Sequence, residues 1–459
     1  MEWPKRALLG LRLVKQLALG RRHDNALRRV VAPLSLYLSL PDRNSPAVMV
    51  LCTEATIKSS VLIVGQYVPT SGLTSVLEYL IGHLNHCFRI SLIGLNYRGP
   101  RLDRGARIYP DLLSGRENAD PRRTNLEAVF EAENPDIVLL FNEVAYQALC
   151  FRRVQAAAGQ CRKIVTYTAV DGEVVKAELF SGLSVADRCV FFSEFGQRQA
   201  ARHIAASRLA IIPHGVDTAL FYPYPGSVEA QFEGDCRRSV RRVLFSKRPD
   251  LIDAFIVLNA NRPWPRKRID LTMEGFALFA RDKPANVKLF LHHPRTDDRE
   301  RARILRMGRN LGISERLLLN PIISGKSEVS IENLNLLYNA CDIGVNTAMG
   351  EGWGLVSFEH AATGAPQIVP RHSACADIWE GAAEFLEPVD DNVFLFASHY
   401  RLKTVAAEDL AGKLEKLYCE LDYRRSMANS AYHRVTLPKY QWASIAAQWE
   451  ALFTSLVRS

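Results

Sequence analysis

The chain has 459 residues, too many for one ordinary hydrophobic core at roughly 150 residues per domain, so we expect two or three domains. Its content of 48% hydrophobic and 23% charged residues excludes an intrinsically disordered protein. Nine cysteines without a C-x-x-C pair suggest neither a disulfide framework nor a zinc site, and they favour a reducing compartment. The net charge of +9 is concentrated near the start, which argues against nucleic acid as a partner.

Residues 1–57 are expected to form a basic N-terminal extension. Its first 30 residues have helical periodicity, with Leu9 and Leu13 on one face and Lys5 and Arg12 on another. Such a helix suits docking on its own protein, an anionic membrane surface or, least well, nucleic acid. Charges interrupt every apolar run before the roughly 18 residues of a membrane span. We therefore expect a cytoplasmic protein with at most peripheral membrane contact.

From residue 58 to 222, short β-branched runs alternate with helical patterns, which is typical of a parallel sheet covered on both faces. A helix is expected over 73–84. The expected strands are 61–67, 88–96, 135–144, 163–170, 188–195 and 209–216. The loop 97–125 is rich in Arg and Tyr.

Residues 223–250 are polar and contain Pro and Gly, as a linker or insertion would. A second α/β domain is expected over 251–430, and the final helix, within 431–459, should cross back to the first domain. The expected strands are 251–262, 287–293, 342–349 and 366–370, and the expected helices are 269–282, 297–311, 331–341, 354–364, 409–435 and 440–456. Two doubly wound Rossmann-like domains would enclose a cleft, and such sheets bind ligands beyond the carboxyl ends of their strands.

The stretch "GEGWGLVSFEHAATGAP" (350–366) follows an expected strand and enters an expected helix. Glycines allow a ligand to approach the backbone, and the free N–H groups of a first helical turn suit a diphosphate. Glu351 is expected in the loop, and Glu359 on the helix, where it can accept hydrogen bonds from ribose hydroxyls.

This stretch resembles the E-x7-E signature of retaining GT-B glycosyltransferases, glycosyltransferase family 4 (group 1) in particular. Three further stretches are similar to the family in order and spacing, namely "GQYVPTSGLTSVL", "IIPHGVDTALFYP" and "NANRPWPRKRIDL". The resemblance covers about residues 60–459. It implies the transfer of a hexose-type sugar from a UDP- or GDP-sugar donor to a glycan, lipid or protein acceptor. The N-terminal domain, 58–222, would then be the acceptor side, with loops such as 97–125 in contact with the acceptor.

The resemblance also implies the site. Glu351 would approach the donor sugar, Arg262 and Lys267 would stabilise the departing diphosphate, and Glu359 would bind the ribose. The donor would also lie near Gly72 and the backbone of Gly354, Leu355 and Val356. Many relatives place a histidine after the strand equivalent to 163–170, but this chain reads "TYTAVDGEVV", with Asp171 near that position. Asp171 either positions the sugar or acceptor, or ends the strand in an Asp-Gly turn.

No Asp-x-Asp occurs in the chain, so we expect metal-independent transfer with no bound cofactor. The missing histidine keeps a non-catalytic nucleotide-sugar-binding protein open as an alternative. A GT-B epimerase or phosphorylase is a further one. His292 and His293 are adjacent on a strand and point to opposite sides, so they are expected to be structural.

Overall fold

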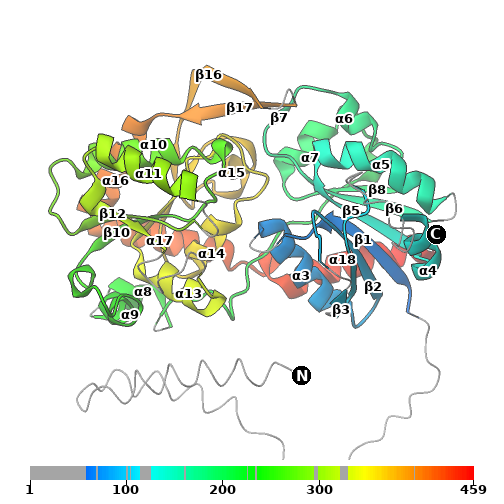
Figure 1. Ribbon diagram of the computed structural model, residues 1–459, viewed down its shortest axis with the longest axis horizontal. Helices are drawn as coiled ribbons and strands as arrows, with labels where there is room; N and C mark the ends of the chain where they lie inside the picture. The colour runs from blue at the N-terminus through cyan, green and yellow to red at the C-terminus, as the bar shows by residue number, and fades with distance from the viewer. Residues whose placement is uncertain are drawn as a thin grey trace, which may run out of the picture.

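The structure is a computed structural model that describes residues 58–458 except for short internal stretches. The excepted stretches are 69–70, 100–101, 104, 114–125, 160–161, 225, 233–234, 294–297, 321–328 and 397–398. The predicted basic extension, 1–57, and much of the 97–125 loop lie outside the described residues. Two α/β domains lie side by side (Figure 1).

The N-terminal domain has an eight-stranded sheet in the order β3-β4-β2-β1-β5-β6-β8-β9, parallel except for β3. Its strands are β1 (Ser60–Gln66), β2 (Arg89–Leu95), β3 (Leu102–Asp103), β4 (Arg107–Tyr109), β5 (Ile137–Glu143), β6 (Lys163–Ala169), β8 (Arg188–Phe191) and β9 (Leu209–Ile211). Its helices are α3 (Gly72–Leu84), α4 (Leu126–Glu133), α5 (Val144–Ala158), α6 (Glu178–Ser181) and α7 (Glu194–Ala200). Val61 and Ile63 belong to one buried core and Leu62 and Val64 to another, because successive side chains of a strand point to opposite faces.

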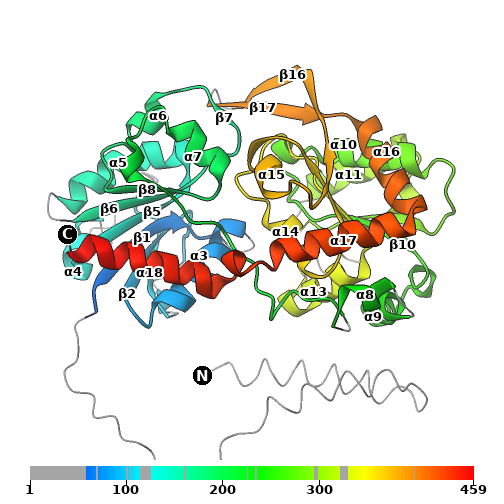
Figure 2. The ribbon, with the colours of Figure 1, turned by 180° about the vertical axis from the view of Figure 1, so that it is seen from behind.

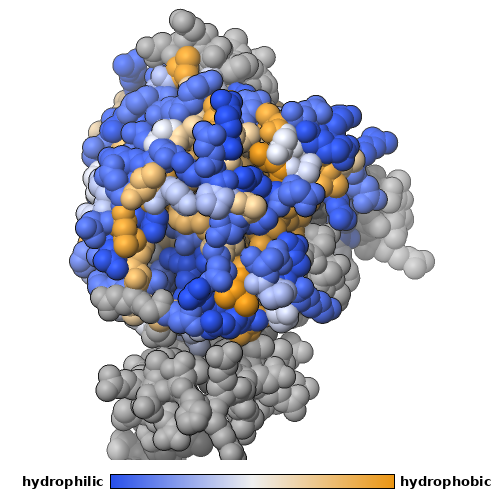
Figure 3. Space-filling view, turned by 90° about the vertical axis from the view of Figure 1, so that its left-hand side faces the viewer, coloured by the Kyte–Doolittle hydropathy of each residue, from blue (hydrophilic) through white to orange (hydrophobic). Residues whose placement is uncertain are grey.

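The C-terminal domain has a parallel six-stranded sheet in the order β12-β11-β10-β13-β14-β15. Its strands are β10 (Phe255–Asn259), β11 (Val287–Leu291), β12 (Leu317–Leu319), β13 (Ile343–Val345), β14 (Gln367–Pro370) and β15 (Glu384–Leu386). Its helices are α8 (Val228–Phe232), α9 (Cys236–Leu244), α10 (Ile269–Ala280), α11 (Asp298–Asn310), α13 (Ile331–Ala340), α14 (Leu355–Ala362), α15 (Ser373–Ile378), α16 (Ala407–Cys419) and α17 (Leu421–Val435). The end of this domain that faces away from its neighbour is mainly hydrophilic, with small hydrophobic groups scattered over it (Figure 3).

Three segments join the two domains. A hairpin of β16 (Pro388–Phe396) and β17 (Tyr400–Val405) pairs with β7 (Glu173–Val174) of the N-terminal domain. Helix α18 (Trp442–Arg458) follows α17 and packs on α3, so the chain returns to the N-terminal domain after residue 435 (Figure 2). Stacking of Tyr79 on Trp442, with ring centroids 4.7 Å apart, holds the start of α18 there.

Several elements of the structure differ from the expectations from the sequence. Residues 223–250, expected as a linker or insertion, contain α8 and α9, and α9 packs on α13, so this segment packs with the C-terminal domain. The helix expected over 409–435 divides at Glu420 into α16 and α17. The strands expected over 188–195, 209–216, 251–262 and 342–349 are shorter, and the hairpin was not foreseen. Within the described residues, no helix is both long and apolar enough to cross a membrane.

Candidate functional site

Two loops at the carboxyl ends of neighbouring strands form the C-terminal side of the candidate site. One follows β10 and carries the basic run 262–268, and the other follows β13 and carries the glycines of 350–354. The two strands pair in parallel, so their carboxyl ends meet at one edge of the sheet. The main-chain N–H of Met349 donates to the carbonyl of Arg266 at 2.8 Å, which fastens one loop to the other.

Glu351 lies at the centre of a buried group of charges. Its Oε1 forms an ion pair with Lys267 and accepts a hydrogen bond from Asn346 Nδ2 at 3.0 Å, and its Oε2 lies 3.7 Å from Arg266 Nη1. Burial opposes ionisation of this carboxyl, but the two cations outweigh it and hold the pKa of Glu351 below its ordinary value. The main-chain N–H of Glu351 donates to Ser373 Oγ at 3.0 Å. Glu351 is therefore an anion held from several sides.

Asp171 reaches this cluster from the N-terminal domain, two residues after β6. Its Oδ2 lies 2.9 Å from Arg266 Nη2, and both side chains are largely buried. A Cβ atom on Gly352 would lie 3.1 Å from Asp171 Oδ1, and one on Gly350 would overlap the carbonyl of Asp171. The two domains therefore touch here, and only glycine leaves room for that approach.

Glu143 adds a second carboxyl on the N-terminal side, at the last residue of β5. The charge of Asp171, together with burial, raises the pKa of Glu143 to about 7, and three cations of the basic loop partly offset this. Arg262 is one of the three. It is exposed, and among the residues that the structure describes it forms no ion pair. Carboxyls from one domain thus face cations from the other.

Helix α14 begins at Leu355, directly after Gly354, which has a φ of 92°. The N–H groups of Leu355 and Val356 have no acceptor within the helix, because they belong to its first turn. A Cβ atom on Gly72, at the start of α3, would lie 3.0 Å from Leu355 Cδ1. The amino ends of α3 and α14 therefore face each other across the domain boundary.

Glu359 is half-buried on α14 and borders a small crevice between the domains. Tyr79 and Asp217 border the same crevice. Burial raises the pKa of Glu359 to about 7, although the hydroxyl of Tyr338, which donates to Oε2 at 3.0 Å, opposes the shift. A carboxyl with one donor already in place has further lone pairs to offer to hydroxyl groups.

The structure brings together most of the residues singled out in the sequence. Lys267, Glu351 and Asp171 lie in one cluster, with Arg262 beside it. Gly72 and the start of α14 lie at the same boundary. The residues missed are Arg266, Asn346, Ser373, Glu143 and Tyr338. Arg266 belongs to the basic run 262–268, but the sequence of a loop does not show which of its cationic side chains points into the site.

Three buried histidines, His214, His292 and His293, have surroundings typical of structural residues. His292 Nδ1 lies 2.8 Å from Asn320 Oδ1, and burial lowers the pKa of His292 to about 4. Burial lowers the pKa of His293 likewise to about 4. His214 is buried under the domain boundary, where the hydroxyl of Tyr167 lies 2.8 Å from its Nδ1. Neutral, buried imidazoles of this kind fit the structural role expected for His292 and His293.

Comparison with known proteins identifies relatives. Residues 322–451 match the family described as glycosyl transferase-like. Among curated proteins, a D-inositol 3-phosphate glycosyltransferase of Geodermatophilus obscurus is 30% identical over 190 residues, which are 40% of this chain and 38% of that protein. A protein of the same name from Acidothermus cellulolyticus is 26% identical over 198 residues, which are 41% of this chain and 39% of that protein. The chain thus spans about two fifths of the length of these curated relatives.

Solved structures extend the likeness to both domains. Sucrose-phosphate synthase from Thermosynechococcus elongatus has a TM-score of 0.66 at 17% identity and covers 87% of this chain, with all of that chain matched. Anabaena HepE in complex with UDP and glucose has a TM-score of 0.64 at 14% identity and covers 86% of this chain, again with all of that chain matched. The chain thus resembles glycosyltransferases in sequence over part of its length and shares the two-domain fold of these solved proteins. The family match begins at residue 322, so it contains Glu351 and Glu359 but not the basic loop.

Proposed function

We propose that this protein is a retaining group 1 glycosyltransferase that moves a hexose-type sugar from a nucleoside-diphosphate donor to a glycan, lipid or protein acceptor. The observation that carries the proposal is the buried cluster of Lys267, Arg266 and Glu351, which lies beside the first turn of α14 and faces Asp171. Cations and helix N–H groups are what a departing diphosphate needs, and a fixed carboxylate is what sugar hydroxyls need.

The leaving group would be stabilised by the C-terminal domain. Sugar transfer passes through an oxocarbenium-like transition state, in which the diphosphate gains negative charge. The guanidinium of Arg262 forms no ion pair with any described residue, so its charge is available to the diphosphate. The N–H groups of Leu355 and Val356, in the first turn of α14, can also donate to it. Lys267 would supply further positive charge while it also holds Glu351 in place.

The transferred sugar would lie between Glu351 and Asp171. Both carboxylates bind Arg266, and each retains lone pairs for sugar hydroxyls. In this scheme Asp171 takes the position that a histidine has in many relatives. Glu359 would bind the ribose in the crevice next to Tyr338. Gly72 would allow the donor phosphate and the acceptor to approach the start of α3.

We further propose that the donor is a UDP- or GDP-sugar and that transfer needs no metal in the cleft. HepE was solved with UDP, which supports a uridine donor by analogy of fold alone. The cations of the basic loop can neutralise the diphosphate without a metal ion. Chelation with EDTA should therefore leave the initial rate of transfer unchanged, and loss of the rate on chelation, restored by Mg²⁺ or Mn²⁺, would overturn the metal-independent scheme.

A thermal-shift screen of nucleotide-sugars tests the proposal, because a ligand that binds only the folded state raises the melting temperature. A UDP- or GDP-hexose should raise it, and the free sugar should not. The same donor should then be hydrolysed slowly without an acceptor. Binding without hydrolysis would instead favour a non-catalytic nucleotide-sugar-binding protein, and an epimerised donor or a requirement for phosphate would favour an epimerase or a phosphorylase. With acceptor, the anomeric configuration of the product, measured by NMR, decides between retention and inversion.

A further inference from the structure

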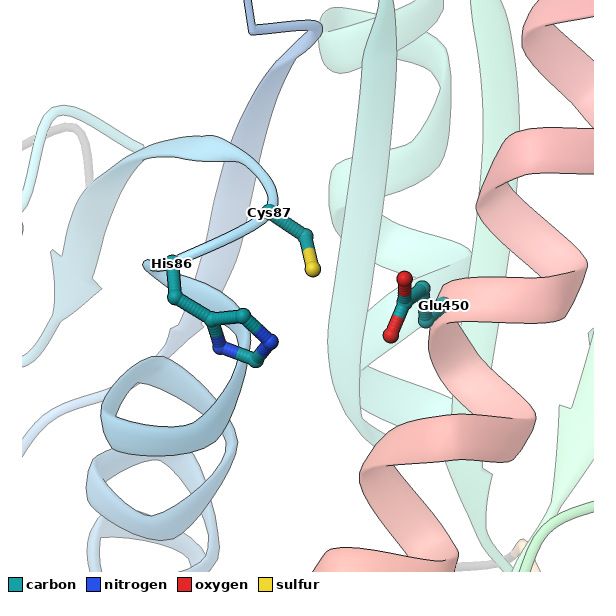
Figure 4. Close-up of side chains that lie close together, drawn as sticks. All are labelled: His86, Cys87 and Glu450. Atoms are coloured by element: carbon teal, nitrogen blue, oxygen red, sulfur yellow. The ribbon is translucent and has the colours of Figure 1, made fainter. Parts of the chain in front are cut away.

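A cluster of three metal-ligating side chains lies outside the cleft, where α18 packs on the N-terminal domain. His86 and Cys87 occupy the turn between α3 and β2, and Glu450 comes from α18, so the three are brought together only by the fold (Figure 4). One ligand atom from each residue lies within 4.8 Å of the other two. The Cys87 thiol and the Glu450 carboxylate point toward each other (Figure 4).

The donor set favours one class of metal. A thiolate, an imidazole and a carboxylate together suit Zn²⁺ and its borderline neighbours, whereas Mg²⁺ and Ca²⁺ take oxygen ligands. Tetrahedral bonds of about 2.1 to 2.3 Å place ligand atoms roughly 3.5 Å apart, so side-chain adjustments of about 1 Å would close the site. His86 is exposed, and the other two residues are half-buried, which leaves a path for the ion and room for a water ligand.

The thiol of Cys87 is already engaged with an anion. The thiol of Cys87 donates a hydrogen bond to the Glu450 carboxylate. The pair thus places one thiol proton beside one negative charge. A divalent cation can replace that proton and neutralise both groups, in the way that metals displace protons from their thiol ligands.

We propose that His86, Cys87 and Glu450 bind one Zn²⁺ ion, with water as the fourth ligand. On binding, the Cys87 S–H bond breaks, the proton passes to solvent, and a thiolate–metal bond forms. The ion would link α18 to the turn that precedes β2. Phe88 and Phe453 already meet there with ring centroids 5.5 Å apart, so the ion would reinforce an existing contact.

The site is separate from the cleft. Helix α3 starts at Gly72, on the domain boundary, and its 13 residues rise about 20 Å before the turn that carries His86. The proposed ion would therefore stabilise the attachment of α18 and take no part in sugar transfer. The failure of one proposal leaves the other standing.

Metal binding by the purified full chain is the test, with Zn²⁺ measured by competition against a chromophoric chelator and Co²⁺ by absorption. We expect one ion per chain, a thiolate-to-Co²⁺ charge-transfer band, and a melting temperature that rises with Zn²⁺. In Cys87→Ser, His86→Ala and Glu450→Gln, the affinity should fall at least about tenfold, since losing even an outer partner of a metal site costs that much. The charge-transfer band should vanish in Cys87→Ser.

Two matched variants control for scattered surface binding. Cys419→Ser removes a thiol whose Sγ also lies near a carboxylate, 3.1 Å from Glu415 Oε1. Unlike Cys87, Cys419 belongs to no cluster of metal-ligating side chains among the described residues. His83→Ala removes a histidine of the last turn of α3. Both should bind Zn²⁺ as the unmodified chain does. The absence of a charge-transfer band, or equal affinity in Cys87→Ser and Cys419→Ser, would overturn the proposal. Circular dichroism without metal checks that each variant is folded.

Discussion

A largely buried carboxylate lies on either side of strand β13, and the two carboxylates have different surroundings. Asp342 directly precedes the strand, and its Oδ2 lies 2.6 Å from Arg241 Nη2 and accepts the main-chain N–H of Ile256 at 2.7 Å. Arg237 Nε lies 3.4 Å from its other oxygen. Every one of these partners belongs to the C-terminal half of the chain, so this cluster is closed within one domain.

Glu351 follows the other end of β13, and its cluster is open. Lys267 and Arg266 bind it from the same domain, but Arg266 also binds Asp171 of the other domain. The same residue types thus fasten α9 to the sheet at the amino end of β13 and line a domain boundary at its carboxyl end. Ligands of parallel α/β sheets bind at the carboxyl ends of strands, so the difference separates a structural charge cluster from a candidate functional one.

The largest effect is expected from breaking the closed cluster. Asp342→Asn leaves Arg241 and Arg237 buried without a full counter-charge, which should lower the free energy of unfolding by about 3 to 5 kcal/mol. Urea unfolding measures this loss. Donor affinity of the folded protein should not change. The matched control is Asp253→Asn, whose partner Arg238 is half exposed, and it should cost at most about 1 kcal/mol. Equal losses in the two variants would remove the distinction between buried and exposed pairs.

Substitutions in the open cluster should lower the rate of catalysis. Lys267→Ala removes a cation from beside the proposed diphosphate, so turnover should fall about 10²- to 10³-fold while donor affinity changes far less. Steady-state kinetics and donor titration measure the two effects separately. Lys283→Ala provides the control, since Lys283 forms an ion pair with Glu415 on α16, with Nζ 2.8 Å from Oε2. A Lys267→Ala enzyme that keeps its turnover would show that this cation serves structure alone.

The sequence predicts the sheet strands well where hydrophobic runs are continuous, as in β1, β5 and β11. It predicts the start of α14 because glycines and an acid surround it. The hairpin of β16 and β17 was missed because its strand partner, β7, is more than 200 residues away in the sequence. The break at Glu420 was missed because no Pro or Gly marks it.

The site was predicted from motifs and could be completed only from geometry. Among the cations of the basic loop, Arg266 is the one that forms an ion pair with Asp171, and Asp171 belongs to the other domain. Glu143 lies at the end of a strand in both the prediction and the structure, but its perturbed pKa depends on Asp171, a residue that no local pattern joins to it. Long-range charge pairs of this kind leave no local spacing in a single sequence.

Glu359 should control donor affinity and its pH dependence. Glu359→Gln removes a charged acceptor for the ribose hydroxyls, and bonds of this kind are worth about 1.5 to 3 kcal/mol, or roughly 10- to 100-fold in Kd. Because burial raises the pKa of Glu359 to about 7, the unmodified protein should bind donor more weakly as the pH falls below 7, where the carboxyl is protonated. Titration of donor at several pH values measures this, and the Gln variant should show no such step.

Tyr338→Phe sharpens the same prediction. It removes the hydrogen bond that lowers the pKa of Glu359, so the step in donor affinity should move to higher pH. If the pH of the step does not change in Tyr338→Phe, or if the step persists in Glu359→Gln, the step belongs to a group other than Glu359.

The smallest effect is expected from Asp171→Asn, and it concerns stability. The folded pKa of Glu143, about 7, lies above the ordinary value of about 4.3, so folding favours the protonated form. The contribution of Glu143 to stability is therefore fullest below pH 4 and is lost as the pH rises toward 7. Asp171→Asn removes the main charge that raises this pKa, so the free energy of unfolding should fall less between pH 5 and pH 8.

Unfolding in urea at several pH values measures the difference, and Glu143→Gln should flatten the same pH range. Glu359 shifts in the same direction but is present in all three proteins, so it cancels in the comparison. An unchanged slope in Asp171→Asn would mean that the two carboxyls are not coupled across the open cluster. A flattened slope would show that the charge of Asp171, from one side of the open cluster, raises the pKa of Glu143. At the other end of β13 the closed cluster pairs Asp342 with two arginines of its own domain.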